Sequence, residues 1–287
     1  MKYLKTYNES IDLDKRKNLI LNRYKKSTIV MNEDAAIKYV LKNCTEWVDN
    51  PIKIKRGIDA HHEYFYSKPV KRLSRDCYNY YTLIMDNAPE WQYYPKRTKS
   101  FICSMYEASQ GEYEYVVIPE DGSNWGIASN EDIYTCFING LSNNDLGLRV
   151  SLEKFFNIFI RISNIYDIEL SDTNWNQFKK GINLLQNKAN ISDELKTYEL
   201  GIGDEYSLKI FSTIEKNIIK NGNTLDNLLN ILSPEINEFK NRTYQELVSD
   251  PKLNFYIENN YECWTDSPCV FVQIKNFNKF LKKLKNI

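Results

Sequence analysis

Apolar and polar residues recur with two different periods along this chain, and the change of period separates helical from strand-rich stretches. Residues 12–50 have a helical pattern that is clearest over 32–41, where acids stand in the first turn and apolar residues recur every three or four positions. Pro51 stops this pattern. We therefore predict an N-terminal helical segment over residues 1–50.

Short strand-like segments dominate residues 51–142. The first of them, 52–58, alternates apolar with basic residues at the period of a half-buried strand and closes on Arg56 and Gly57. A turn containing Gly122 separates two later segments. The predicted strands are 52–58, 100–105, 114–119 and 125–128.

Helical periodicity returns over residues 143–257, and a last apolar strand is predicted at 268–274. The predicted helices are 151–165, 173–187, 205–220 and 224–232, and a basic helix or tail at 278–285 ends the chain. The pattern predicts an α+β fold. In this fold the helical stretch 143–257 is an insertion between the first part of a sheet, 51–142, and its last strand within 258–287.

The composition predicts a globular core, and charged residues are unevenly distributed along the chain. The 287 residues are 42% hydrophobic and 14% aromatic, enough for one large domain or two small ones. The formal net charge is +0, but residues 53–99 hold ten Lys or Arg against five Asp or Glu. Residues 107–132 hold seven acids and no base. This distribution favours a small anionic ligand over a long nucleic-acid track.

The cysteines and histidines do not form a metal-binding pattern. The six cysteines include no CxxC pair, and the two histidines are adjacent, so no zinc site is expected. The sequence shows neither a signal peptide nor an apolar run near the ~20 residues that span a bilayer. We expect a cytoplasmic protein with reduced thiols and no membrane partner.

Three polar sites along the predicted strands are candidates for chemistry. Arg56 offers a permanently charged guanidinium that can bond two phosphate oxygens at once, and Gly57 lets the backbone approach a ligand. Ser100 and Ser104 share one face of the strand that holds them, where hydroxyls can bond a ribose. Glu262 enters the late strand region with a carboxylate able to stabilise positive charge in a transition state.

In this order, the three sites resemble the arginine, serine and glutamate signature of ADP-ribosyltransferases. The resemblance spans roughly residues 52–140 and 258–274, and it implies a split, mostly antiparallel transferase-like core.

The resemblance also assigns roles to individual residues. It implies that NAD is the substrate and that Arg56, with Gly57, holds the NAD phosphates. Ser104 or Ser100 would order the ribose. Glu262 would be catalytic, accepting a hydrogen bond from the nicotinamide-ribose 2′-hydroxyl.

The chain departs from the family pattern at two places. Cys103 and Met105 stand where the family often has small hydroxyl residues, so either serine can be aligned as the functional one. Asn260 stands where the arginine-modifying branch has a second glutamate. The resemblance therefore implies a different acceptor, or NAD hydrolysis alone.

The resemblance implies NAD-dependent transfer of ADP-ribose to a protein acceptor, with a nucleic-acid acceptor as the alternative. The first ten residues resemble the start of many tailed-phage proteins, which implies a phage-encoded modifier of host proteins in the host cytoplasm. One alternative is a non-enzymatic host-interaction protein that keeps a degenerate transferase fold. Another is a nucleic-acid-binding protein that uses the basic segment 53–99, including Lys71, Arg72 and Arg75.

Overall fold

The computed structural model divides the chain into two compact units, each built from segments distant in sequence. The first unit falls within residues 1–70, 108–122 and 267–287, and the second within 71–107 and 123–266. The structure describes residues 27–59, 61–71, 79–108, 111–142, 148, 150–187 and 205–287.

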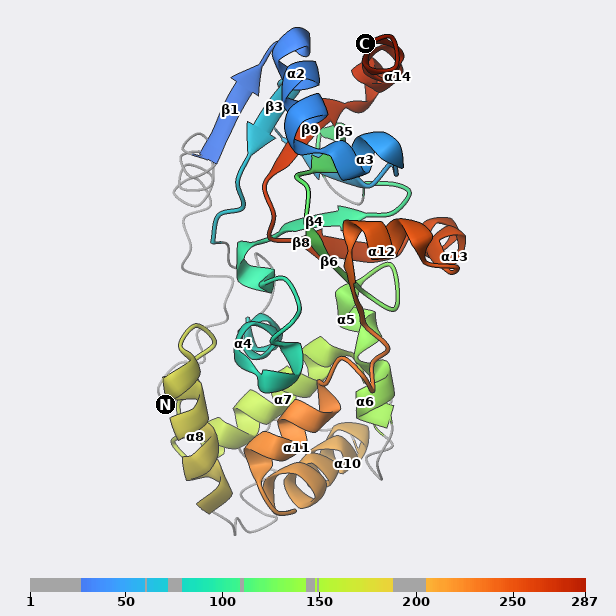
Figure 1. The fold of residues 1–287 in the computed structure, drawn as a ribbon. Coiled ribbons are helices and arrows are strands. Elements are labelled where there is room, and N and C mark those ends of the chain that lie inside the picture. Colours follow the sequence, from blue (N-terminus) through green and yellow to red (C-terminus); the bar gives the residue numbers. More distant parts are fainter. Residues whose placement is uncertain are drawn as a thin grey trace. The chain divides into compact units, whose positions relative to one another are not determined.

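An antiparallel sheet forms the centre of the first unit (Figure 1). Its middle strand is rich in β-branched and aromatic residues and is fully buried, as expected of a strand covered on both faces. In spatial order the strands are β1 (Thr28–Met31), β3 (Tyr64–Ser67), β9 (Cys269–Gln273), β5 (Tyr113–Pro119) and β2 (Lys55–Ile58).

Helices α2 (Glu33–Asn43), α3 (Thr45–Asp49) and α14 (Ile274–Leu284) belong to the first unit. Helix α2 starts where the sequence predicts, because the Asn32 side chain accepts a hydrogen bond from the Ala35 N–H at 2.8 Å. Helix α14 turns its apolar side inward, and its phenylalanine rings contact Trp47 and Tyr64.

A second set of antiparallel strands lies in the second unit, in the order β4 (Phe101–Ser104), β8 (Glu262–Thr265), β6 (Asn124–Ile127) and β7 (Lys240–Thr243). Strand β8 is therefore flanked by strands on both sides. Three of its four residues are buried, and the exception is Glu262, which is partly exposed.

Helices make up most of the second unit (Figure 1). Most of them share one hydrophobic core, which includes Trp264 of β8. Within the ranges given above, none of the helices has the length and apolar run needed to cross a bilayer. The helical elements of the second unit are α4 (Tyr80–Asn87), η1 (Pro89–Trp91), η2 (Arg97–Lys99), α5 (Ile133–Cys136), α6 (Ile138–Ser142), α7 (Leu152–Ile165), α8 (Trp175–Asn187), α10 (Glu205–Ile214), the π-helical turn η3 (Glu215–Ile219), α11 (Thr224–Ile231), α12 (Tyr244–Ser249) and α13 (Leu253–Glu258).

The structure confirms an α+β protein with antiparallel strands. The prediction of helix throughout residues 12–50 is wrong at 28–31, which form β1; residues 12–26 lie outside the described part of the chain. Thr28, Ile29 and Val30 are β-branched, and pairing with β3 decides their conformation.

Candidate functional site

Ser104 and Glu262 lie directly opposite each other on β4 and β8. Both backbone groups of Glu262 bond on the β6 side, its N–H to the Asn130 carbonyl at 3.0 Å and its carbonyl to the Ala128 N–H at 2.8 Å. Ser104 and Glu262 are thus a non-hydrogen-bonded pair, the kind in which Cα atoms are only about 4.5 Å apart and side chains share one face. The structure therefore brings together two of the sequence-predicted site residues.

A buried arginine that the sequence analysis did not select holds the Glu262 carboxylate. The Nη2 atom of Arg97 donates to Glu262 Oε1, and the two side chains are only 3% and 13% exposed. Burial acts to lower the pKa of Arg97, but Glu262 and Tyr81 outweigh this effect and raise it. The guanidinium therefore remains charged beside the carboxylate.

The indole ring of Trp264 packs against the guanidinium of Arg97. Its ring centroid lies 5.1 Å from the guanidinium carbon, and its indole N–H donates to the Pro95 carbonyl at 3.0 Å. Gly126 on the adjacent strand β6 makes room for the indole, because a Cβ atom there would lie 2.2 Å from the ring. The tryptophan thus fixes both the side chain of Arg97 and the chain segment that precedes it.

The side chains of Asp86 and Ser100 hold the short helix η2, which begins at Arg97. Asp86 accepts a hydrogen bond from the Thr98 N–H at 3.2 Å and another from the Thr98 hydroxyl. Burial raises the pKa of Asp86, and the bonds from Thr98 oppose that rise. Ser100 is itself buried and donates to the Arg97 carbonyl at 3.0 Å, so its hydroxyl serves the turn.

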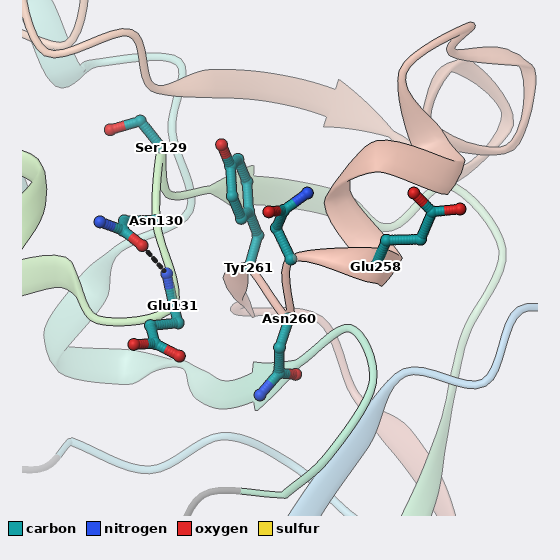
Figure 2. Close-up of a pocket in the computed structure, with 7 residues that line it drawn as sticks. Ser129, Asn130, Glu131, Glu258, Asn260 and Tyr261 are labelled. Atoms are coloured by element: carbon teal, nitrogen blue, oxygen red, sulfur yellow. Dashed lines mark hydrogen bonds between the residues drawn. The ribbon is translucent and has the colours of Figure 1, made fainter.

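A cavity of about 460 Å³ lies where the loop before α5 meets the turn before β8, next to the backbone of Glu262 (Figure 2). Figure 2 shows the labelled side chains pointing in different directions, so they do not converge on one enclosed point. The lining contains two carboxylates and no Lys or Arg, and it consists of Ser129, Asn130, Glu131, Glu258, Asn259, Asn260 and Tyr261.

Asn260 fits the turn before β8 through both its backbone and its side chain. Its backbone is left-handed, with φ of 50°, a conformation that Asn tolerates well. Its side-chain oxygen accepts hydrogen bonds from the Tyr106 N–H at 3.0 Å and the Glu107 N–H at 2.9 Å. The residue thus closes the turn before β8 onto the end of β4.

Cys136 is a buried thiol close to the same loop. Its sulfur donates to the Asp132 carbonyl at 3.3 Å, and burial raises the pKa of the thiol to about 11. The thiol is therefore protonated at neutral pH and is a poor nucleophile. Across the described ranges, no three His, Cys, Asp or Glu side chains are grouped as a metal site.

Arg56 and Gly57 lie on β2 in the first unit, where Arg56 is partly buried and pairs in register with Tyr115 of β5. The backbone of Gly111 lies against that of Gly57, because a Cβ atom on Gly111 would come within 2.3 Å of the Gly57 carbonyl carbon. Their predicted role toward the NAD phosphates stays a prediction.

The basic segment 53–99 uses several of its cations within the protein. Lys55 pairs with Glu114 at 3.3 Å, Lys96 donates to the Asp86 carbonyl at 2.7 Å, and Arg97 binds Glu262. Arg72 and Arg75, named above for nucleic-acid binding, lie outside the described residues.

Comparison with protein-family models, with curated proteins and with solved structures found no significant match to this chain.

Proposed function

We propose that the protein cleaves NAD and transfers its ADP-ribose to a protein acceptor, a host protein if the chain is phage-encoded. The observation that carries the proposal is the direct pairing of Ser104 with Glu262. These two residues were selected from the sequence for the ribose and for the cleavage step. They are adjacent in space although far apart in the chain. An ADP-ribosyltransferase-like core is part of the same proposal.

In the proposed reaction, the bond between the ribose C1′ and the nicotinamide nitrogen breaks, and nicotinamide leaves with the electron pair. The sugar gains positive charge, which the carboxylate of Glu262 stabilises. The hydroxyl of Ser104 orders the ribose beside it. The acceptor then attacks C1′ and loses a proton, so the products are the ADP-ribosylated acceptor, nicotinamide and H⁺.

The cavity beside Glu262 suits the acceptor or the nicotinamide better than the diphosphate. Two glutamates stand among its lining residues without any Lys or Arg, and a negative field repels phosphate. In this proposal none of these lining residues binds the diphosphate.

The test is nicotinamide release and label transfer from labelled NAD in a host lysate. We expect Glu262→Gln to lower the rate by roughly 100-fold or more and Ser104→Ala by about tenfold. Glu153→Gln is the matched control, since it removes an exposed carboxylate from the start of α7, which is not part of the cavity lining.

The proposal fails if the wild-type protein neither releases nicotinamide nor transfers label. In that case the non-enzymatic host-interaction alternative gains support. Full activity of Glu262→Gln would instead show that Glu262 does not have the catalytic role assigned to it, while the proposed reaction would still stand.

A further inference from the structure

We infer that Arg97 is a positioning residue, which holds the carboxylate of Glu262 on the face that Ser104 shares. This inference rests on the proposed function. Arg97 contacts Glu262 through its guanidinium, whose Nη2 atom donates to the carboxylate. Glu262 is the first residue of β8, so the strand fixes the position of its Cα atom. The hydrogen bond from Arg97 fixes the position of its carboxylate.

The chemistry of the contact requires arginine. The guanidinium is planar, so one edge can meet a carboxylate while one face lies over the indole of Trp264. A lysine ammonium has the same charge but cannot present an edge and a face together. The ring contact and the ion pair therefore define one orientation of the side chain.

The burial of the charged Arg97 side chain makes this arrangement depend on Glu262. The Nε and Nη1 atoms of Arg97 are buried and make no hydrogen bond to any residue that the structure describes. Buried donors without acceptors are unfavourable, and a buried charge needs a counter-charge. The carboxylate of Glu262 supplies that charge, so each of the two side chains holds the other in place.

The first experiment separates positioning from general stability through the kinetics of NAD cleavage. We expect Arg97→Gln to lower kcat by roughly 100-fold, because a reacting group displaced by about 1 Å loses about that factor, with KM for NAD changed less than about threefold. Arg97→Lys should recover only part of kcat. Lys99→Gln, which removes an exposed charge from the same short helix η2, should leave both constants unchanged.

The second experiment needs no activity. It is a double-mutant cycle, in which the melting temperature is measured for wild type, Arg97→Gln, Glu262→Gln and the double variant. If the two side chains are directly coupled, the double variant should lose clearly less melting temperature than the two single variants lose in sum. If wild type releases no nicotinamide, the proposed function fails, but this cycle still decides whether Arg97 holds Glu262.

Additive shifts in the cycle would overturn the inference. So would an Arg97→Gln protein that folds and keeps wild-type kcat. Arg97→Lys provides the same cycle with the charge kept, in case Arg97→Gln does not fold.

Discussion

Each unit contains a glutamate bound by one or two basic side chains. The two glutamates are similarly buried, and the difference lies in the exposure of their basic partners. In the first unit, Glu33 at the start of α2 binds Lys279 and Lys283 of α14, whose side chains are 66% and 45% exposed. In the second, Glu262 binds Arg97, which is 3% exposed. Water and salt weaken the first arrangement, whereas the second is shielded and fixed by its neighbours.

A carboxylate and a basic side chain therefore serve two different purposes in this protein. An exposed pair joins two helices with little effect on stability. A buried pair places a carboxylate at a defined point, and its removal is costly because one charge is left without its partner.

The largest expected effect is the loss of one member of the buried pair. Arg97→Met leaves Glu262 unpaired and should lower the free energy of unfolding by about 3–5 kcal/mol, measured by urea unfolding. The double variant Arg97→Met with Glu262→Met should regain most of this loss, since apolar replacement of a whole buried pair is often neutral. A single variant as stable as wild type would contradict the contrast between the two pairs.

A smaller effect is expected at the support of the buried pair. Gly126→Ala places a methyl group against the fully buried Trp264, which should cost about 1–3 kcal/mol of unfolding free energy through overpacking. Gly222→Asn is the control, because no atom lies within 4 Å of where its Cβ would be and Asn tolerates its left-handed backbone. Equal stability of both variants would show that Trp264 can move, and that its contact with Arg97 is loose.

The smallest effect is expected at the exposed pair. Lys283→Met should lower the melting temperature by about 3 °C or less, and the difference should shrink in high salt. A loss as large as that of Arg97→Met, or one insensitive to salt, would contradict the contrast.

The exposed pair also predicts a pH dependence. The hydrogen bond from Lys283 lowers the pKa of Glu33 from its ordinary value of 4.5, against an opposing effect of burial. The unfolded chain therefore takes up this proton first as the pH falls. The contribution of the pair is present above about pH 4.5 and disappears as the pH falls through the lowered pKa, and Glu33→Gln should remove this pH dependence.

The sequence predicted the helices with clear caps and apolar faces. Helices α2, α7 and α11 start at the side-chain caps Asn32, Ser151 and Asn223, close to the predicted bounds. Strands of four residues were harder to predict, since such segments show too few periods to define a face. For that reason β3 and β8 were missed, and Glu262 was placed before a strand at 268–274 and not on β8.

The site could be predicted only in part. Ser104 and Glu262 were selected through a family resemblance, and the structure pairs them. Arg97 stands between lysines in a segment that looks like a solvated basic surface. It is buried by Trp264 and Glu262, and the latter is 165 positions away, a contact that depends on tertiary packing.

The position of β8 between β4 and β6 has a consequence for motion. Strands flanked on both sides usually belong to the last part of a domain to open, and their amide hydrogens exchange slowly with solvent. Lids and binding loops usually belong to the opposite class. The candidate carboxylate therefore starts from a rigid strand, and any movement that admits a substrate has to come from the turn before β8, the loop before α5 or the Glu262 side chain itself.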